Sequence, residues 1–151
     1  MARTIPFART AQAARARRSK TLLLPMPRPE VDRVCLPVHI VLDAMRRGRG
    51  NVTAAQTLYQ AMILTGVLAE AGHGTTTFEQ MREAETIISA AFDRGRDSDV
   101  WALDDEGFRQ FAVIVTTYDY QLRRAPLAVV ADASDQLDSF RAGESLDRMQ
   151  A

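Results

Sequence analysis

The stretch Asn51–Ala69 constrains the fold most, because none of its nineteen residues carries a charge. As a helix it places apolar side chains on nearly every side, and such a helix has to be covered by neighbouring elements. Asn51 or Thr53 can cap its start, and Gly72 can end it in a left-handed conformation. Polar residues interrupt the apolar run, which makes the run too short to span a membrane. We therefore predict that this stretch is the central helix of a bundle.

Charge is divided unequally along the chain. Basic and acidic residues balance at 19 each, but residues 1–29 contain no acid. This first part carries seven positive charges, and residues 30–151 carry a net charge of seven negative. The basic residues of the first part are Arg3, Arg9, Arg15, Arg17, Arg18, Lys20 and Arg28. An acid-free, arginine-rich segment is typical of an arm that contacts nucleic acid.

Residues 1–29 are predicted to form an extended basic arm outside the core. The segment Ala11–Ser19 can form about two turns of helix, but an isolated helix of that length is marginal in water. Pro25, Pro27 and Pro29 favour an extended spacer between the arm and the body.

The other helices follow from apolar periodicity, capping residues and helix breakers. Pro37 is tolerated at the first position of a helix but would break one that begins at Glu30, so the first body helix is predicted from Pro37 to Arg47. Thr76 with Glu79 and Thr77 with Gln80 both fit the capping-box spacing, so a later helix is predicted to start near Thr77. The predicted helices span 37–47, 51–69, 77–94, 104–124 and 126–142.

This pattern predicts an all-α, single-domain bundle of about five helices over residues 30–143, followed by a polar tail over residues 144–151. The apolar stripes that are expected to face the core include Val34, Phe78 and Phe140. The loop Gly95–Leu103 is expected to tuck over the bundle and to carry Trp101 with it.

Nucleophilic and metal chemistry have few candidate residues. Cys35 and His39 are spaced i, i+4, but Pro37 lies between them and two ligands make a poor zinc site. A buried thiol beside a surface imidazole is therefore the favoured interpretation. His39 and Asp43 could form an oriented acid–base pair, but an exposed i, i+4 pair on a helix is the commoner explanation of their spacing. We predict a non-enzymatic protein with no catalytic residues, no metal and no cofactor. A single cysteine and the lack of a recognisable secretory signal favour the cytoplasm, although the basic start also resembles a mitochondrial transit peptide in composition.

Two acidic features have several possible explanations. Asp132, Asp135 and Asp138 recur every third residue and form an acidic ridge. The ridge has three possible roles: a solvated face, a site for a divalent cation, or a surface that binds the basic arm. Asp119 falls close to the apolar stripe of its helix, and a partly buried carboxylate needs a partner. Tyr59, Arg109 or helix-end N–H groups are the expected partners, and a structural hydrogen bond is favoured over a functional role.

The sequence Gly50–Ala55 resembles the opening of the helix-turn-helix of Fis-type regulators, where a G-N-x-T-x-A-A pattern starts the first helix. The chain then continues apolar and unbroken, whereas that motif requires a turn and a polar recognition helix. The segments Asp43–Gly50, Ala102–Phe108 and Tyr118–Leu127 are similar to small helical proteins of proteobacteria and their mobile elements, some labelled as Fis-family regulators. This resemblance implies an all-helical fold and transfers no functional residues.

The function expected from these observations is that of a regulatory binding protein. The seven basic residues of the arm contact nucleic acid independently of its sequence, and the body contacts a protein partner or a second copy. Trp101, Tyr118, Asp119 and Tyr120 are the candidate partner-binding residues, since the aromatic rings can form an exposed patch.

Three alternatives remain open. The chain can be an inhibitor or adaptor from a mobile element, whose acidic body imitates nucleic acid and acts on a host complex without contacting nucleic acid. The arm can be a disordered, solubilising tail. An enzyme that uses carboxylates alone, such as Asp119 and Glu85, is the third alternative.

Overall fold

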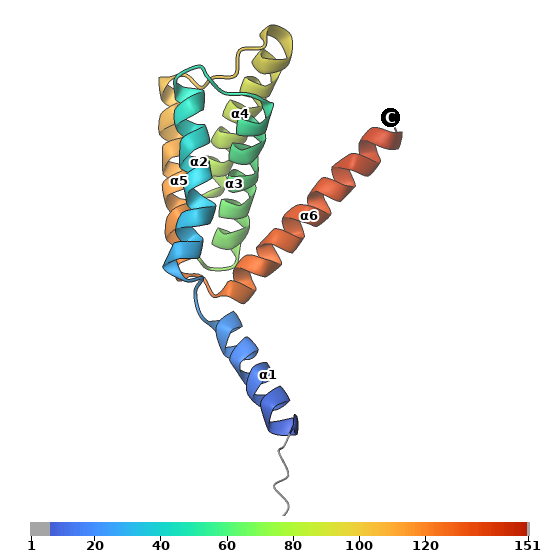
Figure 1. The fold of residues 1–151 in the computed structure, drawn as a ribbon. Helices are drawn as coiled ribbons and strands as arrows, with labels where there is room; N and C mark the ends of the chain where they lie inside the picture. Colours follow the sequence, from blue (N-terminus) through green and yellow to red (C-terminus); the bar gives the residue numbers. More distant parts are fainter. Residues whose placement is uncertain (1–6, 151) are drawn as a thin grey trace, which may run out of the picture.

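The computed structural model describes residues 7–150, and it describes the side chains of residues 11–143. The described residues form six α-helices: α1 (Phe7–Leu23), α2 (Arg28–Arg46), α3 (Val52–Glu70), α4 (Phe78–Ser98), α5 (Asp105–Arg124) and α6 (Leu127–Gln150). Helices α2 to α5 form an antiparallel bundle, and α1 and α6 leave its lower end in different directions (Figure 1). The all-α prediction is confirmed. The count of five is wrong because most of the described arm is helical.

Helix α3 is the centre of the bundle, as predicted. It contacts α2, α4, α5 and α6. The Asn51 side chain caps its start by accepting a hydrogen bond from the Ala54 N–H at 2.8 Å, and Gly72 follows its end with φ +91°. Seven of its residues are buried: Ala54, Ala55, Leu58, Ala61, Met62, Thr65 and Leu68.

The prediction that the apolar run of α3 is too short to span a membrane is wrong. The polar residues do not interrupt helix α3, which is 19 residues long. By length and composition, it is the one helix of the described chain that could cross a membrane. The central helix of a water-soluble bundle has the same composition.

Helix α2 begins nine residues earlier than predicted and contains Pro37. A proline inside a helix removes one hydrogen bond and costs about 3 kcal/mol. Here the Pro37 ring is exposed, while Val31 and Cys35 before it continue the buried stripe of Leu42 and the rest of the helix. Packing on the bundle therefore outweighs the break. The extended spacer shrinks to the residues between α1 and α2, because Pro29 lies in the first turn of α2.

The buried stripe of α2 follows a different register from the predicted one. Val34 is 39% exposed because Val31 and Cys35 occupy the face toward the bundle. Phe78, at 79%, and Phe140, at 46%, are also exposed, which corrects the prediction that both face the core. Phe78 is the first residue of α4, and Phe140 lies on α6, which diverges from the bundle (Figure 1).

The end of α4 differs from the prediction because Gly95 serves packing instead of chain reversal. The helix continues to Ser98, and Asp99 takes the left-handed conformation with φ +57°. A Cβ atom on Gly95 would lie 2.4 Å from the Trp101 ring, which also packs edge-to-face on Phe92. Trp101 therefore closes the upper end of the bundle, as the predicted loop requires.

Capping residues start the next two helices close to the predicted positions. Thr77 and Gln80 form a reciprocal capping box, in which each side chain accepts a backbone hydrogen bond from the other residue. Asp104 caps α5 by accepting a bond from the Gly107 N–H at 2.7 Å. These two helix starts are thus set by hydrogen bonds between residues three positions apart in the sequence.

Gln121 joins α5 to the end of α3 through a buried contact that the sequence did not reveal. Its Nε2 donates to the carbonyl oxygens of Thr65, at 3.0 Å, and His73, at 2.7 Å, and the side chain is 1% exposed. Gly74 makes room for it, because a Cβ atom there would lie 2.6 Å from Nε2. This one amide holds the turn after α3 against α5.

Helix α6 continues to Gln150, which corrects the prediction that Gly143 ends it. Glycine ends a helix most often by adopting a positive φ, and Gly143 is not among the glycines that do so. Ala133 and Leu137 of α6 are buried.

Replacement of Gly95 with alanine should lower the free energy of unfolding by about 1–3 kcal/mol, because the new methyl group meets the Trp101 ring. Alanine has a higher helix propensity than glycine, by about 1 kcal/mol, and the loss from the clash should exceed this gain. Urea unfolding followed by circular dichroism measures it. Gly143→Ala is the matched control: nothing lies within 4 Å of its added Cβ, and its stability should stay equal or rise slightly. Equal stability of Gly95→Ala and the natural chain would contradict the packing role.

Candidate functional site

The basic arm forms a helix that projects from the bundle. Every side chain from Ala11 to Lys20 is exposed, and α1 contains no acid. Its end is held beside α6 by a hydrogen bond from the Leu127 N–H to the Leu24 oxygen at 2.8 Å, and its remainder points away from the bundle (Figure 1).

The structure places five of the seven basic arm residues in α1: Arg9, Arg15, Arg17, Arg18 and Lys20. Arg28 belongs instead to the first turn of α2. Arg3 and the side chain of Arg9 lie outside the described part of the chain.

Positive charge surrounds α1. At 100° per residue, Arg15 and Arg18 point to one side and Arg17 and Lys20 to the opposite side. In the described part of the chain, none of these four side chains forms an ion pair. The arm therefore offers two uncompensated basic faces to an anionic partner.

The predicted aromatic patch does not form. Trp101 is 8% exposed and Tyr118 is 6% exposed, since both face the core. Only Tyr120 of the three candidate rings is accessible, at 50%, and the Arg124 guanidinium lies 4.2 Å from its centroid. Tyr118 and Tyr120 are two residues apart on a helix, which places them on opposite faces. That spacing was a signal in the sequence that these rings cannot share a patch.

Asp119 lies in a charged network between α2 and α5. The Arg123 Nε donates to Asp119 Oδ1, and another Arg123 nitrogen donates to Asp32 at 2.7 Å. The His39 Nε2 lies 3.2 Å from Asp119 Oδ2. Of the predicted partners, Arg109 pairs with Glu106 instead.

The spacing of Asp119 and Arg123 was a signal that sequence reasoning missed, because an i, i+4 acid–base pair is common on helices. His39 and Asp32 come from another helix, and their part depends on how the helices pack. His39 does not pair with Asp43, which binds Arg47 at 2.9 Å.

The network keeps the Asp119 carboxylate ionised. Burial acts to raise the pKa of Asp119 and is the largest single effect, but the hydrogen bonds from Arg123 and His39 and their charges together lower the pKa. The hydrogen bonds to Asp32 and Asp119 raise the pKa of Arg123. These contacts give each carboxylate of the network a partner and explain the network as a structural link between α2 and α5.

Cys35 is a buried thiol, as predicted. Burial, and then the negative charge of Asp119, raise the pKa of Cys35 to about 11. Because the thiolate is the nucleophile, a thiol with this pKa is poorly reactive at neutral pH. Among the described residues, no group of three His, Cys, Asp or Glu side chains is arranged to hold a metal ion.

The acidic ridge is exposed and does not receive the arm. Asp132, Asp135 and Asp138 all face solvent on α6. Within the described ranges, no ion pair joins them to the basic residues of α1. The ridge is therefore a solvated face in this structure.

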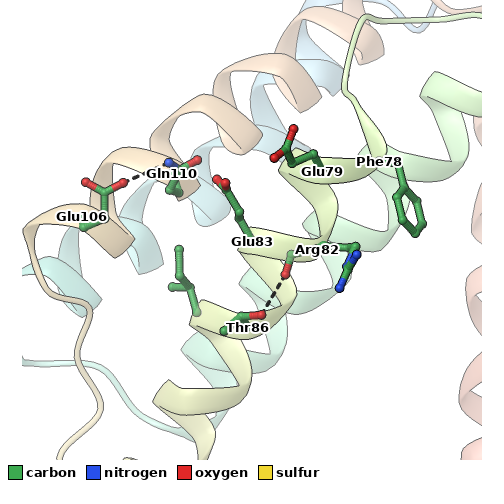
Figure 2. A pocket seen from close by; sticks show the side chains of 8 residues that line it. Phe78, Glu79, Arg82, Glu83, Thr86, Glu106 and Gln110 are labelled. Atoms are coloured by element: carbon green, nitrogen blue, oxygen red, sulfur yellow. Dashed lines mark hydrogen bonds between the residues drawn. The ribbon is translucent and has the colours of Figure 1, made fainter.

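A groove of about 670 Å³ lies along α4 and α5, and sequence reasoning did not find it. Its lining residues are Phe78, Glu79, Arg82, Glu83, Thr86, Ile87, Glu106 and Gln110. Figure 2 shows Glu83 turned toward the space between the helices, while Phe78 and Arg82 lie on the other side of α4. Glu83 and the exposed Phe78 ring therefore lie on different sides of α4.

Comparisons with known proteins gave no relatives. No family model matches the chain, and no curated protein or solved structure matches it.

Asp119→Asn should lower stability at neutral pH by about 1 kcal/mol, because it weakens two charge-assisted hydrogen bonds. The pKa of Asp119 is lowered by folding, so its stabilisation is present above the ordinary aspartate pKa near 4 and is lost as the pH falls through the lowered pKa. The natural chain should therefore lose stability more steeply below about pH 4 than Asp119→Asn does.

Urea unfolding at neutral and acidic pH measures this difference. Asp43→Asn is the control, since its Arg47 pair is on the surface and contributes little. Parallel pH profiles for the natural chain and Asp119→Asn would contradict the role of the network.

Proposed function

We propose that this protein is a non-enzymatic regulatory protein that binds nucleic acid through α1 and a protein partner through its bundle, in the cytoplasm. The observation that carries the proposal is the exposed, acid-free helix α1, whose cations have no intramolecular partner among the described residues. Phosphate groups supply the missing charge, and their counterions are released on binding.

Duplex nucleic acid fits this arm better than single strands do. A helix fits the major groove of B-DNA, which is about 12 Å wide. Single-strand binding relies on aromatic rings for stacking, and residues 11–24 contain none. Arginine and lysine on both faces contact phosphates without reading bases, so binding is expected to be independent of sequence.

The surface for a protein partner is proposed on the outer faces of α2 and α5. These neighbouring helices expose Leu36 and Ile40 on α2, at 60% and 58%, and Val113 and Tyr120 on α5, at 50% each. Exposed apolar side chains on adjacent helices favour contact with a protein. This surface replaces the patch of Trp101 and Tyr118.

A protein-directed inhibitor or adaptor is the second candidate. The observation that favours it is the acidic body, with a net charge of seven negative over residues 30–151. Such a body imitates nucleic acid and contacts a basic host protein. In that case the full chain does not bind duplex DNA even at low salt.

Fluorescence anisotropy with a labelled DNA duplex tests the proposed function. The full chain should bind, and a logarithmic plot of affinity against salt should have a slope of about −4 to −6. Arg15→Gln/Arg17→Gln/Arg18→Gln/Lys20→Gln should bind at least about tenfold more weakly at low salt. Its slope should be smaller by about 4, one for each phosphate that the variant no longer neutralises.

The matched control changes the same net charge on the body, with Arg33, Arg47, Arg49 and Arg141 replaced by glutamine. It should retain most of the affinity and the slope. An equal loss in both variants would show that net charge and not α1 carries the binding, and failure of the natural chain to bind at low salt would refute the proposal.

A further inference from the structure

The groove between α4 and α5 holds uncompensated negative charge. Glu79 and Glu83 are exposed and one helical turn apart on α4, where like charges repel. Within the described residues neither forms an ion pair. Glu106 also lines the groove, from α5, but it is paired with Arg109. Arg82 lies over the Phe78 ring, 5.9 Å from its centroid, on the far side of α4 from Glu83 (Figure 2).

The groove also offers apolar surface. The partly buried Ile87, one helical turn after Glu83, lines it, whereas the exposed Phe78 ring lies on the other side of α4 (Figure 2). A ligand that fits this groove therefore combines cationic groups, for the carboxylates, with an aliphatic group, for the apolar surface.

Helix α1 has this combination on one face. Arg15, Arg18 and Leu22 are spaced i, i+3, i+7, which places two guanidinium groups and an aliphatic side chain on the same side. Leu22 is 44% exposed, and neither arginine has an ion-pair partner in the described part of the chain. Arg15 and Arg18 are about 4.5 Å apart along the axis, and Glu79 and Glu83 about 6 Å, so both pairs can meet.

The helix cannot reach the groove of its own chain in this arrangement. Its end is tied to the start of α6 by the bond between Leu24 and Leu127 and by the bridge between Pro25 and Pro126. From there α1 points away from α4 and α5 (Figure 1). The occupant has to come from another molecule.

We propose that α1 of a second copy of this chain docks in the α4/α5 groove, with Arg15 and Arg18 against Glu79 and Glu83 and Leu22 against the apolar surface. Reciprocal docking closes a dimer, whereas one-way docking builds an open chain of copies. Arg17 and Lys20 remain free on the opposite face. This assembly does not require the proposed nucleic-acid binding, and its test contains no nucleic acid.

Sedimentation velocity of the full chain, from low to high micromolar concentration, tests the association. The natural chain should associate reversibly at low salt and dissociate as salt rises. Arg15→Gln/Arg18→Gln and Glu79→Gln/Glu83→Gln should each weaken association by about tenfold or more. The controls Arg17→Gln/Lys20→Gln and Glu70→Gln/Glu85→Gln make the same changes of charge elsewhere and should retain it.

A charge-reversal pair gives the decisive result. Glu79→Arg/Glu83→Arg has a basic groove and a basic arm, and Arg15→Glu/Arg18→Glu has an acidic arm and an acidic groove. Each variant should be monomeric alone, whereas a mixture should form one-to-one complexes because both contacts are then complementary. All four side chains are exposed, so folding should persist, and circular dichroism checks it. A mixture that stays monomeric, a natural chain that stays monomeric, or controls that lose association equally would each overturn the proposal.

Discussion

The burial of α3 is the constraint on which the rest of the structure depends. A helix of 19 residues whose one charged residue is Glu70 at its end cannot be left in water on any broad side, and it is covered by α2, α4, α5 and α6. The apolar faces of those helices in turn pack against α3 and against one another. Some apolar side chains remain exposed on all four of them, such as Ile40, Phe78, Val113 and Phe140.

Polar contacts align the helices that hydrophobic burial brings together. Hydrophobic burial is non-directional, whereas hydrogen bonds require specific geometry. Gln121 bonds two backbone oxygens at the lower end of α3, the Asp119 network ties α5 to α2, and the Trp101 carbonyl accepts from the Gly50 N–H at the upper end, at 3.1 Å. The polar clusters that resemble chemical sites are therefore explained by the fold. The functional surfaces have to be sought in groups without partners.

The unpartnered groups have opposite charges and lie on different elements. Cations on two faces of α1 have no acid nearby, and Glu79 and Glu83 in the α4/α5 groove form no ion pair, within the described residues. The net charge of zero therefore conceals a strongly polarised molecule. A helix with two basic faces can bind phosphate on one face and carboxylate on the other, so our two proposals are compatible. They also compete wherever both partners require Arg15 and Arg18.

The sequence by itself determined the helical class, the central place of α3, and the starts of α3, α4 and α5. These features depend on periodicity and on caps such as Asn51 and Thr77, whose contacts span three residues. Only the tertiary structure decided that Pro37 lies inside α2, that Gly95 makes room for Trp101, and that His39 and Asp32 meet the Asp119–Arg123 pair. Each depends on the rotation and register of one helix against another, which short-range spacing does not encode. The exposure of Tyr120 and the burial of Tyr118 were determined partly by the sequence and partly by the tertiary structure. Helical spacing places the two rings on opposite faces, but only packing decides which ring faces water.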